Sequence, residues 1–166
     1  MAHMVRYSTD DGDRLAPSVT FRVKAKTRNV PDDMMLVSAL LNMRYSGTFG
    51  LRLPPGVRRV IKPSTAYTDE TSLFTKDFQR FVKIRSDGIV SPLPLGHSAG
   101  LLGHYTVWRL YMEMVWVATS MGDSDAEQTI LSVLKSRPVL SGIDRDNPTV
   151  GPEVVHGGNP TVEGPT

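Results

Sequence analysis

The 166-residue sequence contains no cysteine, so it can form no disulfide, no thiolate nucleophile and no thiolate metal site. It also lacks an apolar run near the roughly 20 residues that a membrane-spanning helix needs, and no signal-peptide pattern opens it. No Gly-Lys-Ser/Thr motif for cradling phosphates occurs. An intracellular, reducing environment is compatible with these absences, and any membrane contact is expected to be peripheral.

The composition is that of a folded domain with an uneven charge. Apolar residues make up 40% of the chain and charged residues 22%, which argues against general disorder. The net charge is only +2, but the residues before Arg137 carry 17 Lys and Arg against 13 Asp and Glu. From Arg137 onward two bases face four acids. We therefore expect a mildly basic folded part and a mildly acidic C-terminal part.

The length predicts one domain, with a segment on either side of it. Residues 1–17 open with Met-Ala-His-Met, which reads like a cloning remnant and is left out of the fold prediction. Residues 18–138 are predicted to form the globular domain. Residues 139–166 are rich in Pro and Gly and contain Asn-Pro-Thr-Val twice, which is typical of a tail. We expect this tail to dock on its own subunit or on a neighbour.

Alternation of apolar and polar residues predicts strands. In residues 18–28 the set beginning with Val19 and Phe21 alternates with basic residues, which places the two sets on opposite faces of a strand. Residues 104–118 alternate over a longer span with one face almost wholly apolar, which predicts a long core strand. Residues 48–53 and 57–62 read as two extended segments around a Pro-Pro-Gly turn.

Helical signals are strongest in two places. Residues 31–47 have a proline at the first helical position, acids in the first turn and a glycine to end the helix. The second helix follows Ser124-Asp-Ala-Glu127, which has the pattern of a capping box. Residues 73–85 fit a short helix that passes into a strand near Val82. The fold class predicted is α+β, with an antiparallel sheet of about five strands packed with two main helices.

Candidate metal ligands are few. His97 and His104 are seven residues apart with no acid between them, which favours histidines that make ordinary hydrogen bonds. Asp10, Asp11 and Asp13 surround a glycine, but the later ligands of a calcium loop are missing, which favours a solvated acidic turn. We therefore predict no metal and no cofactor.

A hydrolase is the only enzymatic alternative with a motif behind it. Gly96-His-Ser-Ala-Gly100 has the outline of a nucleophile elbow, with Ser98 as the nucleophile. The elbow must lie between a strand and a helix, whereas here prolines precede it and a predicted strand follows. We therefore predict that the chain is not an enzyme and has no catalytic residues.

Basic residues are the main candidates for binding. Four of them would project from one face of the strand over residues 18–28 at about 7 Å spacing, and three more follow the Pro-Pro-Gly turn. Together they would meet the phosphate groups of lipid or nucleic acid without burying a charge. A merely solvated sheet face is the alternative. The residues concerned are Arg22, Lys24, Lys26, Arg28, Arg58, Arg59 and Lys62.

Several short segments also occur in a recognisable order. They are Phe21-Arg-Val-Lys24, Val37-Ser-Ala-Leu40, Met43-Arg-Tyr-Ser-Gly47, Leu102-Gly-His-Tyr-Thr106, Leu110-Tyr-Met112 and Gly122-Asp-Ser-Asp-Ala-Glu127. In this order they resemble the globular domain of rhabdovirus matrix proteins, particularly those of the vesiculoviruses, in patches over residues 18–136. The chain departs from that family in its budding motif, because Pro54-Pro55-Gly56-Val57 lacks the tyrosine of Pro-Pro-x-Tyr.

The resemblance implies a viral matrix protein, which self-associates, binds anionic membrane and condenses the nucleocapsid during assembly and budding. The partners it implies are further copies of the chain, anionic lipid, and nucleocapsid or RNA, with no small-molecule substrate. The locations it implies are the virion and the host cytoplasm, peripheral to membrane, with the nucleus also allowed. A nucleic-acid-binding or coat protein that contacts RNA phosphates through the same basic face is the alternative. For self-association we expect the tail repeats, Asn147, Pro148, Thr149, Val150, Asn159, Pro160, Thr161 and Val162.

Overall fold

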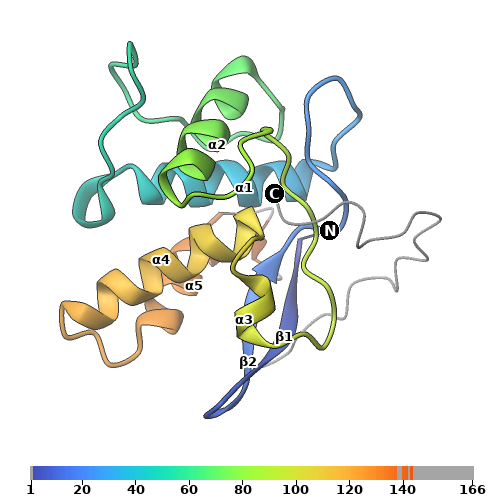
Figure 1. The fold of residues 1–166 in the computed structure, drawn as a ribbon. Helices are drawn as coiled ribbons and strands as arrows, with labels where there is room; N and C mark the ends of the chain where they lie inside the picture. Colours follow the sequence, from blue (N-terminus) through green and yellow to red (C-terminus); the bar gives the residue numbers. More distant parts are fainter. Residues whose placement is uncertain (1, 138–139, 142, 144–166) are drawn as a thin grey trace.

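The computed structural model describes residues 2–137, 140–141 and 143 (Figure 1). Helix α1 crosses the middle of the molecule, and it contacts α2 on one side and α4 and α5 on the other. A β-hairpin packs against α4, and the short α3 lies beside the hairpin. The elements in chain order are β1 (His3–Thr9), β2 (Gly12–Ser18), α1 (Pro31–Arg44), the 3-10 helix η1 (Gly47–Phe49), α2 (Asp69–Phe81), α3 (Ala99–Leu102), α4 (Thr106–Ser120) and α5 (Ala126–Lys135).

The helix predicted over residues 31–47 is confirmed as α1. Pro31 occupies its first turn and two acids follow, where the helix dipole favours them. Ten of its 14 residues are buried, because neighbouring helices cover it on opposite sides. The helix ends at Arg44, and Gly47 then reverses the chain with a φ of 52°.

Strands β1 and β2 form an antiparallel hairpin whose register runs from His3 opposite Ser18 to Thr9 opposite Gly12. Along β1, the buried Val5 and Tyr7 alternate with the exposed Arg6 and Ser8, so one face of the strand belongs to the core. The sequence predicted residues 1–17 to lie outside the domain, with residues 1–4 as a cloning remnant. The structure instead starts its only described sheet at His3, which is buried with Met4 and Val5.

The prediction of a sheet of about five strands is wrong. Across the described residues the structure has one two-stranded antiparallel sheet and five α-helices. Residues 48–53 and 57–62 form no strands there; η1 and an irregular loop take their place. The turn between them is present, because the amide of Val57 donates to the carbonyl of Pro54 and Gly56 has a φ of 80°.

The long strand predicted over residues 104–118 is the helix α4. The alternation of its residues favoured a strand, but a strand of this length would extend about 50 Å. That is more than a domain of this size can cover, whereas the helix extends about 22 Å. Nine of the 15 residues of α4 are buried because α1, α5 and β2 all contact it. Burial over so much of the circumference hides the helical period in the sequence.

The strand predicted over residues 18–28 is also absent. Val19 and Val23 are buried as expected, but Phe21, assigned to the same core face, is 52% exposed. The amides of Thr20 and Phe21 donate to the buried carboxylate of Asp33, at 2.8 and 3.0 Å, and not to a neighbouring strand. Val23 makes only a single bridge. A side-chain acceptor has therefore taken the place of a sheet ladder.

Helix α2 confirms the helical part of the prediction for residues 73–85 but begins earlier. Thr68 and Thr71 form a reciprocal capping box at its start. The strand expected near Val82 does not form, because the chain turns at Lys83, which has a φ of 59°.

The helix predicted after residue 124 is confirmed as α5, but its expected capping box is absent. The N-cap is Asp125, without a side-chain capping bond. Asp123 instead accepts hydrogen bonds from the amide of Asp125 at 2.9 Å and from the hydroxyl of Thr129 at 2.7 Å. Beyond the helix, Leu140 and Ile143 are buried in the core. Residues that the sequence analysis assigned to the tail thus belong to the folded domain.

Candidate functional site

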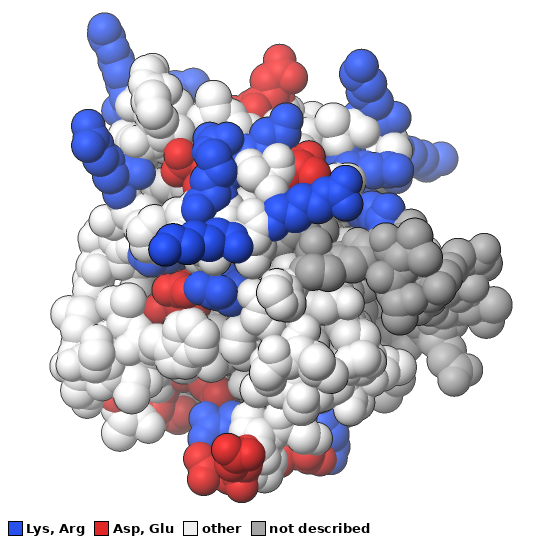
Figure 2. Space-filling model, viewed as in Figure 1, with Lys and Arg blue, Asp and Glu red and all other residues white. Residues whose placement is uncertain are grey.

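Positive charge is concentrated in one part of the molecule. Residues 19–88 carry 13 Lys and Arg against six Asp and Glu. The remaining described residues, mainly 2–18 and 89–137, carry five against seven. Residues 19–88 form α1, η1, α2 and their loops, in the upper part of Figure 1, and the Lys and Arg side chains gather there in Figure 2. The uneven charge of the sequence is therefore a separation of charge in space.

Most of the cations of this region are exposed, and few of the exposed ones lie near a described carboxylate. Within residues 19–88 ten Lys and Arg are exposed, whereas Asp69 is the only exposed acid. Arg80 and Arg85 approach the carboxylates of Asp77 and Asp87 at 3.8 and 3.3 Å, and the other eight have no described carboxylate within 4.0 Å. We call these ten residues the basic end: Lys26, Arg28, Arg52, Arg58, Arg59, Lys62, Lys76, Arg80, Lys83 and Arg85.

The first loop of the basic end is held by one amide side chain. Asn29 accepts a hydrogen bond from the amide of Lys24 at 3.1 Å and donates to the carbonyl of Lys24 at 3.0 Å. It also donates to the carbonyl of Thr27 at 3.3 Å. Lys26 lies between them in the left-handed region, with a φ of 58°. The loop is thus closed on itself, and it carries Lys26 and Arg28 exposed beside the half-buried Lys24.

The second loop is held against α1. Asn42 donates to the carbonyl of Ile61 at 2.8 Å, and the hydroxyl of Ser38 accepts from the amide of Ser64 at 2.8 Å. Ile61 itself is buried. Two polar side chains of α1 and one apolar anchor therefore fix the segment from which Arg58, Arg59 and Lys62 are exposed.

The sequence analysis placed four cations on one strand face, and this geometry is wrong. Arg22 is half-buried, and burial lowers the pKa of its guanidinium, against the opposing effect of Asp87. Lys24, Lys26 and Arg28 are carried by the loop that Asn29 closes. The structure brings them to the same end of the molecule as Arg58, Arg59 and Lys62, and the binding role of all these residues stays a prediction.

Five members of the basic end were not predicted, namely Arg52, Lys76, Arg80, Lys83 and Arg85. A signal was present for two of them. Lys76 and Arg80 are four residues apart, so they share a side of α2 opposite the buried Phe74 and Phe78. The sequence analysis read this part of the segment as a short helix, so the shared side of Lys76 and Arg80 could have been found from the sequence.

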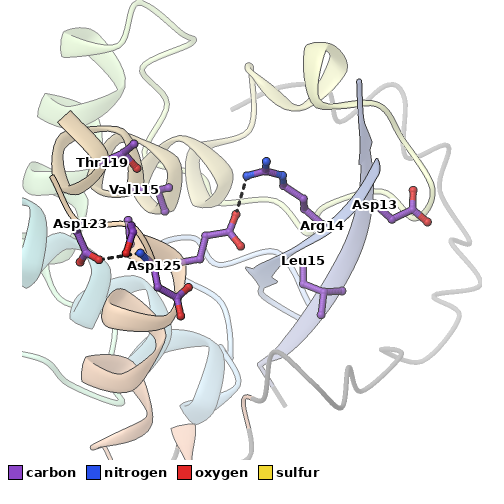
Figure 3. Close-up of a pocket in the computed structure, with 10 residues that line it drawn as sticks. Asp13, Arg14, Leu15, Val115, Thr119, Asp123 and Asp125 are labelled. Atoms are coloured by element: carbon purple, nitrogen blue, oxygen red, sulfur yellow. Dashed lines mark hydrogen bonds and ion pairs between the residues drawn. The ribbon is translucent and has the colours of Figure 1, made fainter. Parts of the chain in front are cut away.

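At the other end of the molecule lies an open groove of about 600 Å³, shown in Figure 3. Strand β2, the end of α4 and the start of α5 form its walls. Arg14 reaches across to Glu127 at 3.5 Å. Burial, together with the nearby Glu127, raises the pKa of the Tyr7 hydroxyl to about 12. The groove is lined by Asp13, Arg14, Leu15, Val115, Thr119, Asp123, Ser124, Asp125, Ala126 and Glu127, so acids outnumber bases there.

The other candidates from the sequence do not assemble into a site. His97, Ser98 and His104 are exposed, and Ser98 directly precedes the four-residue α3 without a described strand leading into it. In the described part of the chain no three His, Asp or Glu residues are grouped to hold a metal ion. The acids of residues 10–13 form the exposed turn of the hairpin. The tail repeats expected to mediate self-association lie outside the described residues.

Comparison of the chain with protein-family models, curated proteins and solved structures gives no match. Among the helices of the described residues, none combines the length and apolarity needed to cross a membrane. The function is therefore argued from the surface itself.

Proposed function

We propose that this protein is a non-enzymatic binding protein whose basic end attaches it to the anionic surface of a membrane. The observation that carries the proposal is the ten exposed cations over residues 19–88 against one exposed carboxylate. A Lys or Arg near an anionic bilayer contributes about 1 kcal/mol. Attraction falls off within a Debye length of about 8 Å, and simultaneous contact by half of the ten would contribute about 5 kcal/mol.

The arrangement of these cations favours a membrane over RNA. In Figure 2 they project outward around the upper edge of the molecule, and the groove described above lies at the opposite, acidic end. Phe21 and Phe81 are 52% and 53% exposed, and Phe81 directly follows Arg80 of the basic end. Exposed apolar side chains next to cations suit the headgroup region of a bilayer, where both find favourable surroundings.

A wider role follows from the resemblance to rhabdovirus matrix proteins. We propose that the protein self-associates on the membrane and holds the viral nucleocapsid there during assembly and budding. The support for this role is the order of the short segments over residues 18–136 together with the basic end. The expected five-stranded sheet does not support it, since the fold differs.

The proposal is tested by vesicle co-sedimentation of the full chain with phosphatidylserine mixed into phosphatidylcholine, and with phosphatidylcholine alone. The basic-end variant is Arg58→Gln, Arg59→Gln and Lys62→Gln. At about 1 kcal/mol for each cation, losing three should weaken binding to anionic vesicles roughly a hundredfold. Neutral vesicles should bind neither protein.

A matched control removes the same charge elsewhere, through Arg6→Gln, Lys135→Gln and Arg137→Gln. We expect this control to bind anionic vesicles within a few-fold of wild type. An equal loss in both variants would show that net charge alone matters and would overturn the assignment to the basic end. RNA binding measured in parallel decides the alternative, because tight, strongly salt-dependent RNA binding without vesicle binding would assign the cations to nucleic-acid phosphates.

A further inference from the structure

From the first loop of the basic end we infer that Asn29 is a positioning residue for contact with anionic headgroups. The inference rests on the proposed function and adds to it that the arrangement of the cations matters as well as their number. Asn29 is neutral and contributes no attraction to a phosphate of its own. Its part would be to hold Lys24, Lys26 and Arg28 in one array.

The hydrogen bonds of Asn29 explain how one side chain can do this. The side-chain oxygen accepts from the amide of Lys24 and the side-chain nitrogen donates to the carbonyl of the same residue, at 3.1 and 3.0 Å. This pairing imitates a backbone bridge between positions 24 and 29. The Thr27 hydroxyl also donates to the carbonyl of Lys24, at 3.0 Å, which closes the loop from inside.

Lys26 shows that this conformation needs support. Its φ of 58° lies in the left-handed region, which is unfavourable for a residue with a side chain. Without the bonds from Asn29 the loop would leave this conformation and sample others. Binding would then have to restore the array, and fixing even one backbone residue corresponds to roughly a tenfold loss in the binding constant.

The same device occurs in the second loop. Asn42, another neutral amide, donates to the carbonyl of Ile61 next to Lys62. Among the described residues no carboxylate holds either loop, so order is imposed without cancelling the positive charge. A surface of this kind keeps its cations in fixed positions and leaves their charge free to attract anionic headgroups.

The test compares three full-length variants in anionic vesicle binding over a range of salt concentrations. Asn29→Ala removes the bonds and keeps every charge. The variant Lys24→Gln, Lys26→Gly and Arg28→Gln removes the charges, with glycine at position 26 because it accepts the positive φ. Gln128→Ala is the control, since it deletes a neutral amide on α5, outside the basic end, that donates to Ser132.

We expect Asn29→Ala to weaken binding about tenfold while the dependence on salt stays as in wild type, because the same cations still contact the membrane. The charge variant should weaken binding and also flatten the salt dependence. Gln128→Ala should bind like wild type. Thermal unfolding of each variant is followed, and binding is measured well below every midpoint, so that loss of the fold does not enter.

The outcomes separate the inference from the function on which it rests. Wild-type binding by Asn29→Ala together with weak binding by the charge variant would overturn the positioning role and leave membrane attachment in place. A flattened salt dependence in Asn29→Ala would overturn it as well, since the cations would then have left the interface. Wild-type binding by the charge variant and by the Arg58, Arg59 and Lys62 variant would overturn the proposed function.

Discussion

Replacing Gln79 should cost several kcal/mol of stability, because its side chain satisfies buried backbone groups. Gln79 is fully buried in α2, and its side-chain nitrogen donates to the carbonyl of Ile89 and to the hydroxyl of Thr106, both at 3.0 Å. Its side-chain oxygen accepts from the amide of Gly88 at 2.9 Å. One side chain therefore joins α2, which carries part of the basic end, to the following loop and to the first turn of α4.

The magnitude follows from what Gln79→Ala leaves behind. The amide of Gly88 and the carbonyl of Ile89 lose their partner, and each buried unsatisfied group costs about 1–3 kcal/mol. A cavity adds to this cost. We therefore expect a loss of about 4 kcal/mol in the free energy of unfolding, a large share of the roughly 5–15 kcal/mol available to a domain.

Urea unfolding followed by circular dichroism measures the effect. Gln79→Met separates volume from hydrogen bonding, because it fills the space and makes none of the bonds, and it should be destabilised by about 3 kcal/mol. Gln128→Ala on the surface of α5 should change stability by less than about 0.5 kcal/mol. If Gln79→Met were as stable as wild type, the hydrogen bonds could not be what joins these elements.

Three further changes test other parts of the structure. Burial raises the pKa of Asp33 above its ordinary value of 3.8, against the lowering effect of its bonds from Thr20 and Phe21. Because the folded state then holds the proton more tightly, the stability that this group contributes is fully present below pH 3.8 and is lost as pH rises through the raised pKa. Urea unfolding of Asp33→Asn across the acid range should therefore lack this dependence of the unfolding free energy on pH. The same pH dependence in Asp33→Asn and wild type would contradict the burial argument. Gly88 has a φ of 75° and an added Cβ would lie 3.1 Å from the Lys76 side chain, so Gly88→Ala should lower the melting temperature, whereas Gly100→Ala, with nothing within 4 Å, should not. Removing residues 144–166 should abolish higher assembly and keep the fold. The cut follows Ile143 because a cut at residue 139 would remove the buried Leu140 and Ile143. An unchanged sedimentation coefficient would count against self-association through the tail.

Helices marked by local signals could be predicted, because those signals act within a few residues. Pro31, the acids behind it and Gly47 mark α1 without reference to any other part of the chain. The strands could not, because alternation was read without knowing what would cover each face. Thr106–Ser120 is a helix packed against α1, α5 and β2, and the amide of Thr20 goes to a carboxylate 13 residues further on. Both outcomes depend on tertiary contacts.

For the candidate site, too, some features could be predicted from local sequence and others depend on tertiary contacts. That Lys26, Arg28, Arg58 and Arg59 would be exposed was a local expectation, since charged residues rarely enter a core. Their meeting at one end of the molecule depends on α1, which holds the second loop through Ser38 and Asn42. The strand face predicted for the cations of residues 22–28 does not form, because Asp33 accepts the amides of Thr20 and Phe21 and Asn29 closes the loop that follows.

The choice of neutral residues to hold the basic loops leads to a last prediction. Ten exposed cations repel one another, so the basic end lowers stability unless a partner neutralises it. Asn29→Asp keeps an acceptor for the Lys24 amide, loses both donated bonds, and places a negative charge among three cations. We expect its stability to fall less than that of Asn29→Ala, because the new ion pairs offset part of the loss, while its binding to anionic vesicles falls further. Thermal unfolding and vesicle co-sedimentation of the two variants give the comparison, and binding by Asn29→Asp above that of Asn29→Ala would mean that order in the loop outweighs its charge.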